Sequence, residues 1–106
     1  MIARVWHGWT LSENADLYER YLRTKIFPGI QQVKGYKGAH FFRRHDGDEV
    51  EFVTITYFDS LEAVQSFAGP NYRAAVISEA AARLLSRYHP EAAHYTVAIG
   101  PELGTR

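Results

Sequence analysis

The stretch from Glu49 to Tyr72, EVEFVTITYFDSLEAVQSFAGPNY, constrains the fold of this chain most strongly. Side chains alternate over Glu51–Phe58, which predicts a strand. One face of this strand carries Phe52, Thr54, Thr56 and Phe58, and the other carries Val53, Ile55 and Tyr57. Because apolar or β-branched side chains occupy both faces, we expect water to cover neither face completely.

The same stretch continues into a short helix. Asp59-Ser60 offers an N-cap, and with Asp59 as the cap, Glu62 stands where a capping box needs an acid. Gly69-Pro70 ends the helix. Between these ends, apolar residues recur at helical spacing: Leu61, Val64, Phe67 and Ala68. We therefore expect a central strand that leads directly into a helix packed back on the sheet.

The remaining elements are predicted from the same two patterns, alternation of side chains for strands and helical spacing for helices. Alternating side chains predict three further strands, at Ile2–Trp9, Gly38–His45 and Ala93–Ile99. Helical spacing predicts a helix that begins after Ser12 or Asn14 and is stopped by Pro28-Gly29. A second helical pattern covers Glu79–Arg87. Three strands and two helices therefore surround the central strand-helix unit.

The order of these elements is β-α-β-β-α-β with an extra helical piece before the last strand, and Asp46-Gly47-Asp48 forms a tight hairpin turn. This is the ferredoxin-like pattern, an α+β fold in which an antiparallel sheet carries its helices on one face. The length of 106 residues suits a single domain. We assign that domain to residues 1–99 and expect residues 100–106, which contain Gly and Pro, to form a flexible tail.

Strand alternation assigns side chains to the two faces of the sheet. We place His7 on the helix face, and Trp6, Phe42 and some aromatic residues of the central strand on the opposite face. An antiparallel sheet with a solvated face should alternate cleanly between apolar and polar residues, and this one does not. We therefore predict a C2 homodimer through the second sheet face. The alternative is a monomer with scattered surface aromatics.

Charge and composition exclude several classes of function. The chain carries 12 basic and 12 acidic side chains, which argues against nucleic acid or an anionic membrane as a partner. It has no cysteine, which excludes disulfides, thiolate nucleophiles and sulfur-ligated metals. No apolar run approaches the roughly 20 residues of a membrane span, and no signal peptide pattern is present. A cytoplasmic location is predicted.

The five histidines do not predict a metal site. His40 and His45 lie on opposite faces of one predicted strand, and Pro90 separates His89 from His94. No pair has the i, i+4 spacing of a helical zinc site. The chain also has no glycine-rich nucleotide loop. We therefore expect no bound metal and no other cofactor.

Four passages of the sequence resemble the antibiotic biosynthesis monooxygenase (ABM) superfamily. They are the first strand IARVWHGWT, the passage PGI…KGYKGAHFFRR before the charged hairpin, the unit EFVTITYFDSLEAVQSFAG and the closing AAHYTV. The resemblance implies a dimeric α+β barrel with a pocket inside each protomer, between the sheet and its helices. The superfamily includes cofactor-independent quinone-forming monooxygenases, haem-degrading monooxygenases and members without a known reaction.

The haem-degrading branch places an Asn on the first strand, a Trp on the helix after the third strand and an axial His beyond that Trp. In this chain His7 stands at the Asn position, Phe67 at the Trp position, and Val76 and Ile77 around the axial position. A haem iron needs an axial ligand such as His, Cys, Tyr or Met. The resemblance therefore does not extend to haem degradation by the family route. Tyr72 or His7 as another iron ligand has no supporting motif.

The quinone-forming branch surrounds a phenolic substrate with Trp, Asn, Tyr and Arg, and the substrate anion itself reacts with oxygen. For a phenolic substrate of this kind, Trp9, Tyr18, Tyr21 and Tyr72 could form an aromatic pocket. On family and residue type we expect a pocket for a small aromatic or apolar ligand, lined by Trp9, Tyr57, Phe67 and Tyr72. His7 is the candidate catalytic residue, because histidine titrates near neutral pH and could take a phenolic proton.

Two interpretations of these residues stay open. A histidine on an apolar face is often a satisfied core residue, and Tyr57, Phe67 and Tyr72 are side chains that any core of this shape needs. The leading function is an ABM-type protein that binds a small aromatic molecule and oxygenates it without a metal or flavin. The alternative is a non-catalytic ligand-binding or stress-associated dimer on the same scaffold.

Overall fold

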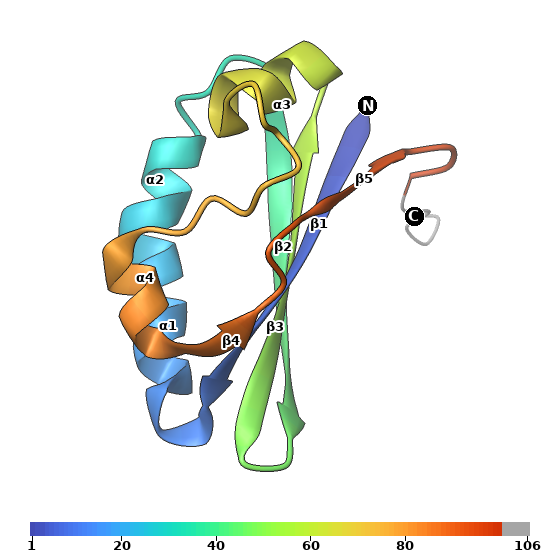
Figure 1. Cartoon of the computed structure of the whole chain (residues 1–106). Helices are drawn as coiled ribbons and strands as arrows, with labels where there is room; N and C mark the ends of the chain where they lie inside the picture. The colour runs from blue at the N-terminus through green and yellow to red at the C-terminus, as the bar shows by residue number, and fades with distance from the viewer. Residues whose placement is uncertain (101–106) are drawn as a thin grey trace, which may run out of the picture.

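A computed structural model describes residues 1–100 and consists of one antiparallel sheet with helices packed on it (Figure 1). The strands are β1 (Ile2–Leu11), β2 (Tyr36–Asp46), β3 (Glu49–Phe58), β4 (Leu85–Tyr88) and β5 (Ala93–Thr96). The helical segments are η1 (Ser12–Asn14), α1 (Ala15–Tyr21), η2 (Leu22–Ile26), α2 (Phe27–Ile30), α3 (Leu61–Ala68) and α4 (Glu79–Leu84). This arrangement confirms the predicted α+β ferredoxin-like fold.

Strand β1 lies in the middle of the sheet. The strand order is β2-β3-β1-β4, and β5 pairs with β1 as well, so that β4 and β5 share one edge of β1. Leu85 of β4 pairs with Thr10, and Thr96 of β5 pairs with Ile2 at the other end of the same edge. β4 and β5 therefore act as one edge strand that is interrupted after Tyr88.

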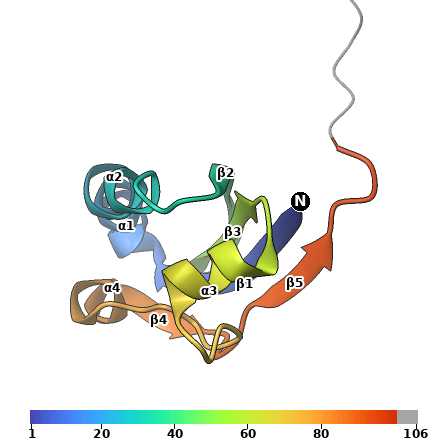
Figure 2. The ribbon, with the colours of Figure 1, turned by 90° about the horizontal axis from the view of Figure 1, so that it is seen from above.

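The helices cover one face of the sheet. Figure 1 shows α1, α2 and α4 along one side of the strands, and Figure 2, seen from above, places α3 on that side as well. Tyr18 of α1, Leu22 of η2 and Ala81 of α4 form a buried cluster with Val50 and Phe52 of β3. Within residues 1–100, no helix covers the opposite face.

A second buried cluster lies at the other end of β3. Phe58 packs there against Ile30 of α2 and against Ala63 and Val64 of α3. The side chains of Phe58 and Val64 are fully buried. Both clusters therefore depend on β3, and one of them on the helix that follows it. This confirms that the stretch from residue 49 to residue 72 is central to the fold.

The predicted helix Glu79–Arg87 is wrong in its last turn. The helix α4 ends at Leu84, and the chain then continues as strand β4. Arg87 pairs with Trp9 and Leu85 pairs with Thr10. The backbone N–H and C=O groups of this segment form hydrogen bonds with the free edge of β1. This strand pairing overrides the helical propensity of the sequence.

The first helix does not stop at Pro28-Gly29 as predicted. A π-helical segment, η2, follows α1, and α2 then continues to Ile30 with the proline in its first turn. Proline is tolerated there because the first turn of a helix does not need its missing N–H. The wider π turn directly before it allows the helical direction to continue.

Two smaller predictions, about the start of α3 and the end of β5, are also wrong. Ser60 caps α3, because its Oγ accepts a hydrogen bond from the backbone N–H of Ala63 at 3.2 Å; Asp59 instead donates its own N–H to the carbonyl of Gly35. Strand β5 ends at Thr96, earlier than predicted. Of the tail predicted to be flexible, residues 101–106 lie outside the described part of the chain.

Gly35 provides a direct test of how the loop before β2 packs on α3. Its φ is +89°, and a Cβ atom at this position would lie 2.6 Å from the Cβ of Ala63 and 2.6 Å from Oδ1 of Asp59. We expect Gly35→Ala to lower the free energy of unfolding by about 2–4 kcal/mol, from backbone strain and overpacking together. Urea denaturation at fixed protein concentration measures this change.

Gly29→Ala is the matched control, because a Cβ atom at Gly29 would meet nothing within 4 Å. Gly29 lies inside α2, where alanine is the better helix former, so this variant should lose no stability. Equal unfolding midpoints for the two variants would show that the close packing of Gly35 against α3 is wrong.

Candidate functional site

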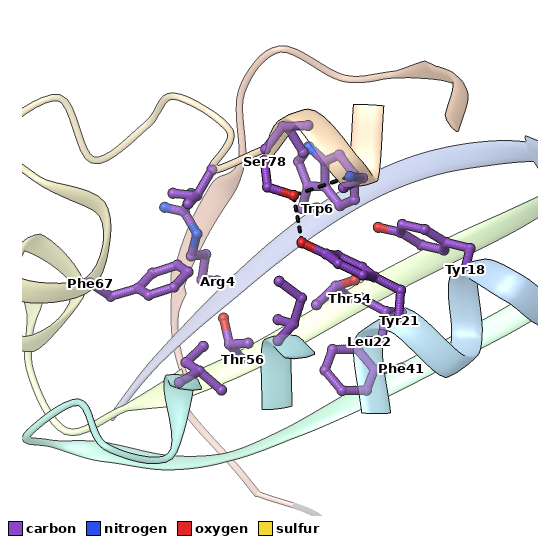
Figure 3. A pocket seen from close by; sticks show the side chains of 15 residues that line it. Arg4, Trp6, Tyr18, Tyr21, Leu22, Phe41, Thr54, Thr56, Phe67 and Ser78 are labelled. Atoms are coloured by element: carbon purple, nitrogen blue, oxygen red, sulfur yellow. Dashed lines mark hydrogen bonds between the residues drawn. The ribbon is translucent and has the colours of Figure 1, made fainter. Parts of the chain in front are cut away.

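A cavity lies between the helix face of the sheet and the segments that cover it (Figure 3). Its volume is about 640 Å³ when the space at its open mouth is included. The side chains that line it are Arg4, Trp6, Tyr18, Tyr21, Leu22, Ile26, Ile30, Phe41, Thr54, Thr56, Phe67, Val76, Ile77, Ser78 and Ala81. A mainly apolar lining with a few polar groups is typical of small-molecule sites.

The sequence of β3 explains why space is left here. Its helix face carries Phe52, Thr54, Thr56 and Phe58 in order, and the two phenylalanines belong to the two buried clusters. The smaller threonines between them line the cavity. Two large side chains at the ends and two small ones in the middle therefore divide the core and leave a hollow between its halves.

Strand β1 completes the floor of the cavity with Trp6, which pairs with Thr54 across the sheet. The Nε1 of Trp6 donates a hydrogen bond to the carbonyl of His89 at 2.8 Å. The indole lies against Gly8, where a Cβ atom would come within 2.6 Å of the ring. Gly8 and the carbonyl of His89 therefore fix the indole in the orientation that borders the cavity.

Residues 76–78, which connect α3 to α4, cover part of the cavity. Ser78 caps α4 by accepting a hydrogen bond from the N–H of Ala81 at 3.1 Å. The hydroxyl of Tyr21 lies 2.5 Å from the same Ser78 Oγ, and Figure 3 shows this contact joining α1 to the connection. Val76 and Ile77 add apolar surface beside this pair. The hydroxyl pair is one polar group facing the cavity.

Arg4 is the second polar group, and it is only 4% exposed. Its Nη1 donates to the carbonyl of Tyr72 and lies 3.0 Å from Nε2 of His94, and its Nη2 donates to the carbonyl of Ala74 at 2.9 Å. Its guanidinium also lies over the ring of Phe67, 5.6 Å from the centroid. Burial lowers the pKa of Arg4, but an arginine side chain stays protonated in proteins.

Tyr18 and His94 are neutral groups near this site. Burial raises the pKa of the Tyr18 hydroxyl, with a smaller contribution from Tyr21, so the phenol does not ionise near neutral pH. Burial also lowers the pKa of His94, and the charges of Arg4 and Arg73 lower it further. The neutral imidazole of His94 can therefore accept a hydrogen bond from Arg4 through Nε2.

Two of the residues predicted for the pocket lie at this cavity or beside it. Phe67 of α3 lines it and stacks on Phe58, with ring centroids 5.8 Å apart. Tyr72 borders the site through its backbone, because its carbonyl accepts the hydrogen bond from Arg4. The ring of Tyr72 packs edge-on against His94, with centroids 5.1 Å apart.

The predicted orientation of His7, Trp9 and Tyr57 toward the helices is wrong. His7 pairs with Val53 and Ala3 pairs with Tyr57, so these residues share the face opposite the cavity. The register of β1 on β3 assigns the faces: Trp6, not His7, stands beside the cavity threonines. His7 therefore cannot reach a ligand in the cavity to act as its base.

On this outer face, His7 belongs to a polar cluster around Glu51. The carboxylate of Glu51 lies 2.9 Å from His7 Nδ1 and 2.7 Å from Arg44 Nε. Hydrogen bonds from His7 and then from Arg44 hold the pKa of Glu51 below its usual value. Beside it, the guanidinium of Arg87 lies 3.9 Å from the ring centroid of Trp9. His7 and Trp9 therefore each contact a charged side chain on this face.

The sequence indicated Tyr21 as a possible pocket residue, but it did not indicate Arg4, Trp6 or Ser78 as members of the same site. Arg4 had a detectable sign, because it is a charged residue within an otherwise apolar first strand. A charge at such a position needs buried polar partners or a ligand. The contact of Tyr21 with Ser78 had no such sign, because the two residues are 57 positions apart in the chain.

Among residues 1–100, no group of three or more His, Asp or Glu side chains is placed to hold a metal ion. None of the helices in this range is long and apolar enough to cross a membrane.

Comparison with known proteins gives matches at the level of structure. No protein-family model matches the sequence, and no curated protein matches it. The monooxygenase ActVA-Orf6 of Streptomyces coelicolor, solved in complex with nanaomycin D, has a TM-score of 0.68 and 20% identity, covering 98% of this chain and 92% of that chain. A Bacillus cereus protein assigned as an antibiotic biosynthesis monooxygenase has a TM-score of 0.65 and 10% identity. The match covers 99% of this chain and 98% of that chain.

A haem degrader is among the similar structures as well. MhuD of Mycobacterium tuberculosis, with two haems bound in its active site, has a TM-score of 0.61 and 16% identity, covering 96% of this chain and all of that chain. Identities this low establish the fold alone. The chain therefore has the ferredoxin-like fold of the ABM proteins, as the sequence resemblance implied.

Proposed function

We propose that this protein binds a small aromatic molecule in the cavity between sheet and helices and oxygenates it without a metal or flavin. The observation that carries the proposal is the cavity lining, in which Trp6 and Phe67 present rings beside two polar groups, Arg4 and the Tyr21–Ser78 pair. The complex of the similarly folded ActVA-Orf6 with nanaomycin D supports a small organic ligand for this fold.

The reaction class that suits this cavity is oxidation of a phenol to a quinone. With 1-naphthol, one oxygen atom of O₂ replaces hydrogen on the ring and the other leaves as water. The substrate supplies all four electrons, so the products are naphthoquinone and water and no external reductant is consumed. The Tyr21–Ser78 pair is placed to hydrogen-bond the phenol oxygen, and the surrounding apolar side chains exclude water.

Haem degradation is not part of the proposal, although MhuD has a similar fold. Phe67, Val76 and Ile77, which the family resemblance aligns with the haem-contacting positions, all line the cavity. Their side chains are apolar and cannot coordinate iron. The residues at these positions therefore do not fit a haem bound in the family manner.

Thr54→Phe tests whether ligands enter this cavity. A phenyl ring at residue 54 would fill the hollow between Phe52 and Phe58. We expect it to weaken binding of the neutral fluorescent probe N-phenyl-1-naphthylamine by at least roughly tenfold, about 1.4 kcal/mol. Fluorescence titration measures the Kd. Thr96→Phe is the control, because Thr96 is exposed on β5, and it should leave the Kd within about twofold.

Oxygen uptake with 1-naphthol separates the enzyme from the binding module. The proposal expects consumption of one O₂ per naphthoquinone formed, at a rate above that of the protein-free solution and reduced in Thr54→Phe. Binding of 1-naphthol without oxygen uptake would favour the alternative, a non-catalytic ligand-binding dimer. Equal probe binding by wild type and Thr54→Phe would contradict the location of the site.

We also propose that the outer sheet face forms a homodimer. Val5, Val53 and Ile55 are only partly covered on this face, and Phe42 and Tyr95 are 51% and 58% exposed. These side chains form an apolar surface with no helix over it in the described part of the chain. A second copy of the same face would bury this surface with two-fold symmetry. Two sheets packed in this way would form the dimeric α+β barrel.

Phe42→Glu tests this interface. A glutamate on the outer face would bury two unpaired charges at a two-fold contact. We therefore expect the variant to sediment as a monomer in sedimentation velocity at micromolar concentration. Leu17→Glu is the matched control, because Leu17 is 50% exposed on α1, on the helix side of the molecule. A wild-type protein with the mass of one chain would contradict the dimer.

A further inference from the structure

Arg4 is a buried positive charge beside the cavity, and among the described residues no carboxylate lies within 4 Å of it. Two other arginines have acidic partners. Arg43 pairs with Asp16 and Glu19, and Arg87 pairs with Glu49. Those arginines are far more exposed than Arg4. The most buried arginine of the described chain is thus one that lacks an acidic partner.

Burial of a charge without a counter-charge is costly, and buried charges in proteins are usually paired or fully hydrogen-bonded. The partners of Arg4 are all neutral: the carbonyls of Tyr72 and Ala74 and the imidazole of His94. They satisfy three of the five N–H donors of the guanidinium. Nε–H and one N–H of Nη2 make no hydrogen bond within residues 1–100, so Arg4 keeps donors for a further acceptor.

The surroundings of Arg4 favour an acceptor on an aromatic ligand. The guanidinium lines the cavity and lies over the ring of Phe67, and Trp6 lies two residues further along the same strand face. Figure 3 shows Arg4 beside Phe67 at the cavity. A ring bound among these aromatic side chains would bring a substituent on its edge close to the guanidinium. Arginine binds carboxylates through two parallel hydrogen bonds, more strongly than neutral acceptors.

We propose that the natural ligand is an aromatic carboxylic acid, ionised when bound, whose carboxylate pairs with Arg4. The inference rests on the proposed function, since it names the chemical class that the same cavity takes. It adds one requirement that the cavity lining alone does not make: the ligand carries a negative charge. A substrate with both a phenol and a carboxylate would match the Tyr21–Ser78 pair and Arg4 together.

A purely structural role for Arg4 would lead to a different ligand preference. Arg4 ties the connection between α3 and α4 to β1, through Tyr72 and Ala74. If this were its whole role, the wild-type protein would bind neutral and anionic aromatic molecules equally. A matched pair of probes, 2-naphthoate and the neutral 2-naphthamide, therefore distinguishes the two roles without any substitution.

The test measures the Kd of both probes for the wild-type protein by isothermal titration calorimetry at pH 7 and low salt. We expect 2-naphthoate to bind at least roughly tenfold more tightly than 2-naphthamide, as a charge-assisted hydrogen bond allows. Arg4→Gln should bring the two values within about twofold, because it removes the charge and keeps hydrogen-bonding groups. Arg4→Lys should retain part of the preference, because it keeps the charge without the planar fork.

Arg73→Gln is the matched control. Arg73 is exposed, lies between the two residues whose carbonyls bind Arg4, and contributes positive charge to the same region. The preference for 2-naphthoate should remain within about twofold of wild type in this variant. Thermal unfolding of each variant, followed by circular dichroism, shows whether Arg4→Gln still folds. If it does not fold, the wild-type comparison of the two probes and Arg4→Lys still decide the question.

The outcomes separate the two proposals. Equal binding of both probes by the wild-type protein would overturn the role of Arg4 and leave the aromatic cavity standing. A preference for 2-naphthoate that persists in Arg4→Gln would also overturn it, because the charge would then be recognised elsewhere. No binding of either probe, together with no binding of N-phenyl-1-naphthylamine, would overturn the proposed function as well.

Discussion

The pairing of β1 with β3 is the constraint on which the rest of the structure depends. The register runs without a shift from Ile2 against Phe58 to Leu11 against Glu49. Because side chains alternate along a strand, a slip of one residue would move every side chain of β1 to the other face. This register places Arg4 and Trp6 under the helices and turns His7 outward. The chemistry available to a ligand is therefore decided by strand pairing and not by residue type alone.

The cavity exists because the core is built in two parts. Phe52 and Phe58 each fill one cluster, and the threonines between them are too small to join the clusters. Arg4 lies between the strand and the connection that covers this hollow, and its hydrogen bonds to two carbonyls hold that connection in place. A ligand that pairs with Arg4 would thus contact a residue on which the cover of its own site depends. Binding and ordering of residues 72–78 are expected to be coupled through this side chain.

The sequence was sufficient to predict the element order, which side chains of β3 share a face, and the helix that follows β3, because these features are local and strongly periodic. The face of β1 could not be predicted, since Ala3, Val5, His7 and Trp9 are as apolar a set as Ile2, Arg4, Trp6 and Gly8. The end of α4 depended on pairing with β1, and the Tyr21–Ser78 contact on packing of distant segments. Phe67 lines the cavity because α3 directly follows β3, whereas His7, Trp9 and Tyr57 lie on the opposite face of the sheet.

The most direct test of this account uses the two tryptophans, which lie on opposite faces of the sheet. Trp6 borders the cavity, and Trp9 packs under Arg87 on the outer face. Their indole N–H signals can be followed in a ¹H–¹⁵N NMR spectrum during titration with 2-naphthoate and assigned with Trp6→Phe and Trp9→Phe. If the ligand enters the cavity, the Trp6 signal shifts to saturation while the Trp9 signal stays in place. A saturating shift of Trp9 with Trp6 unchanged would place the ligand on the outer face and contradict the account.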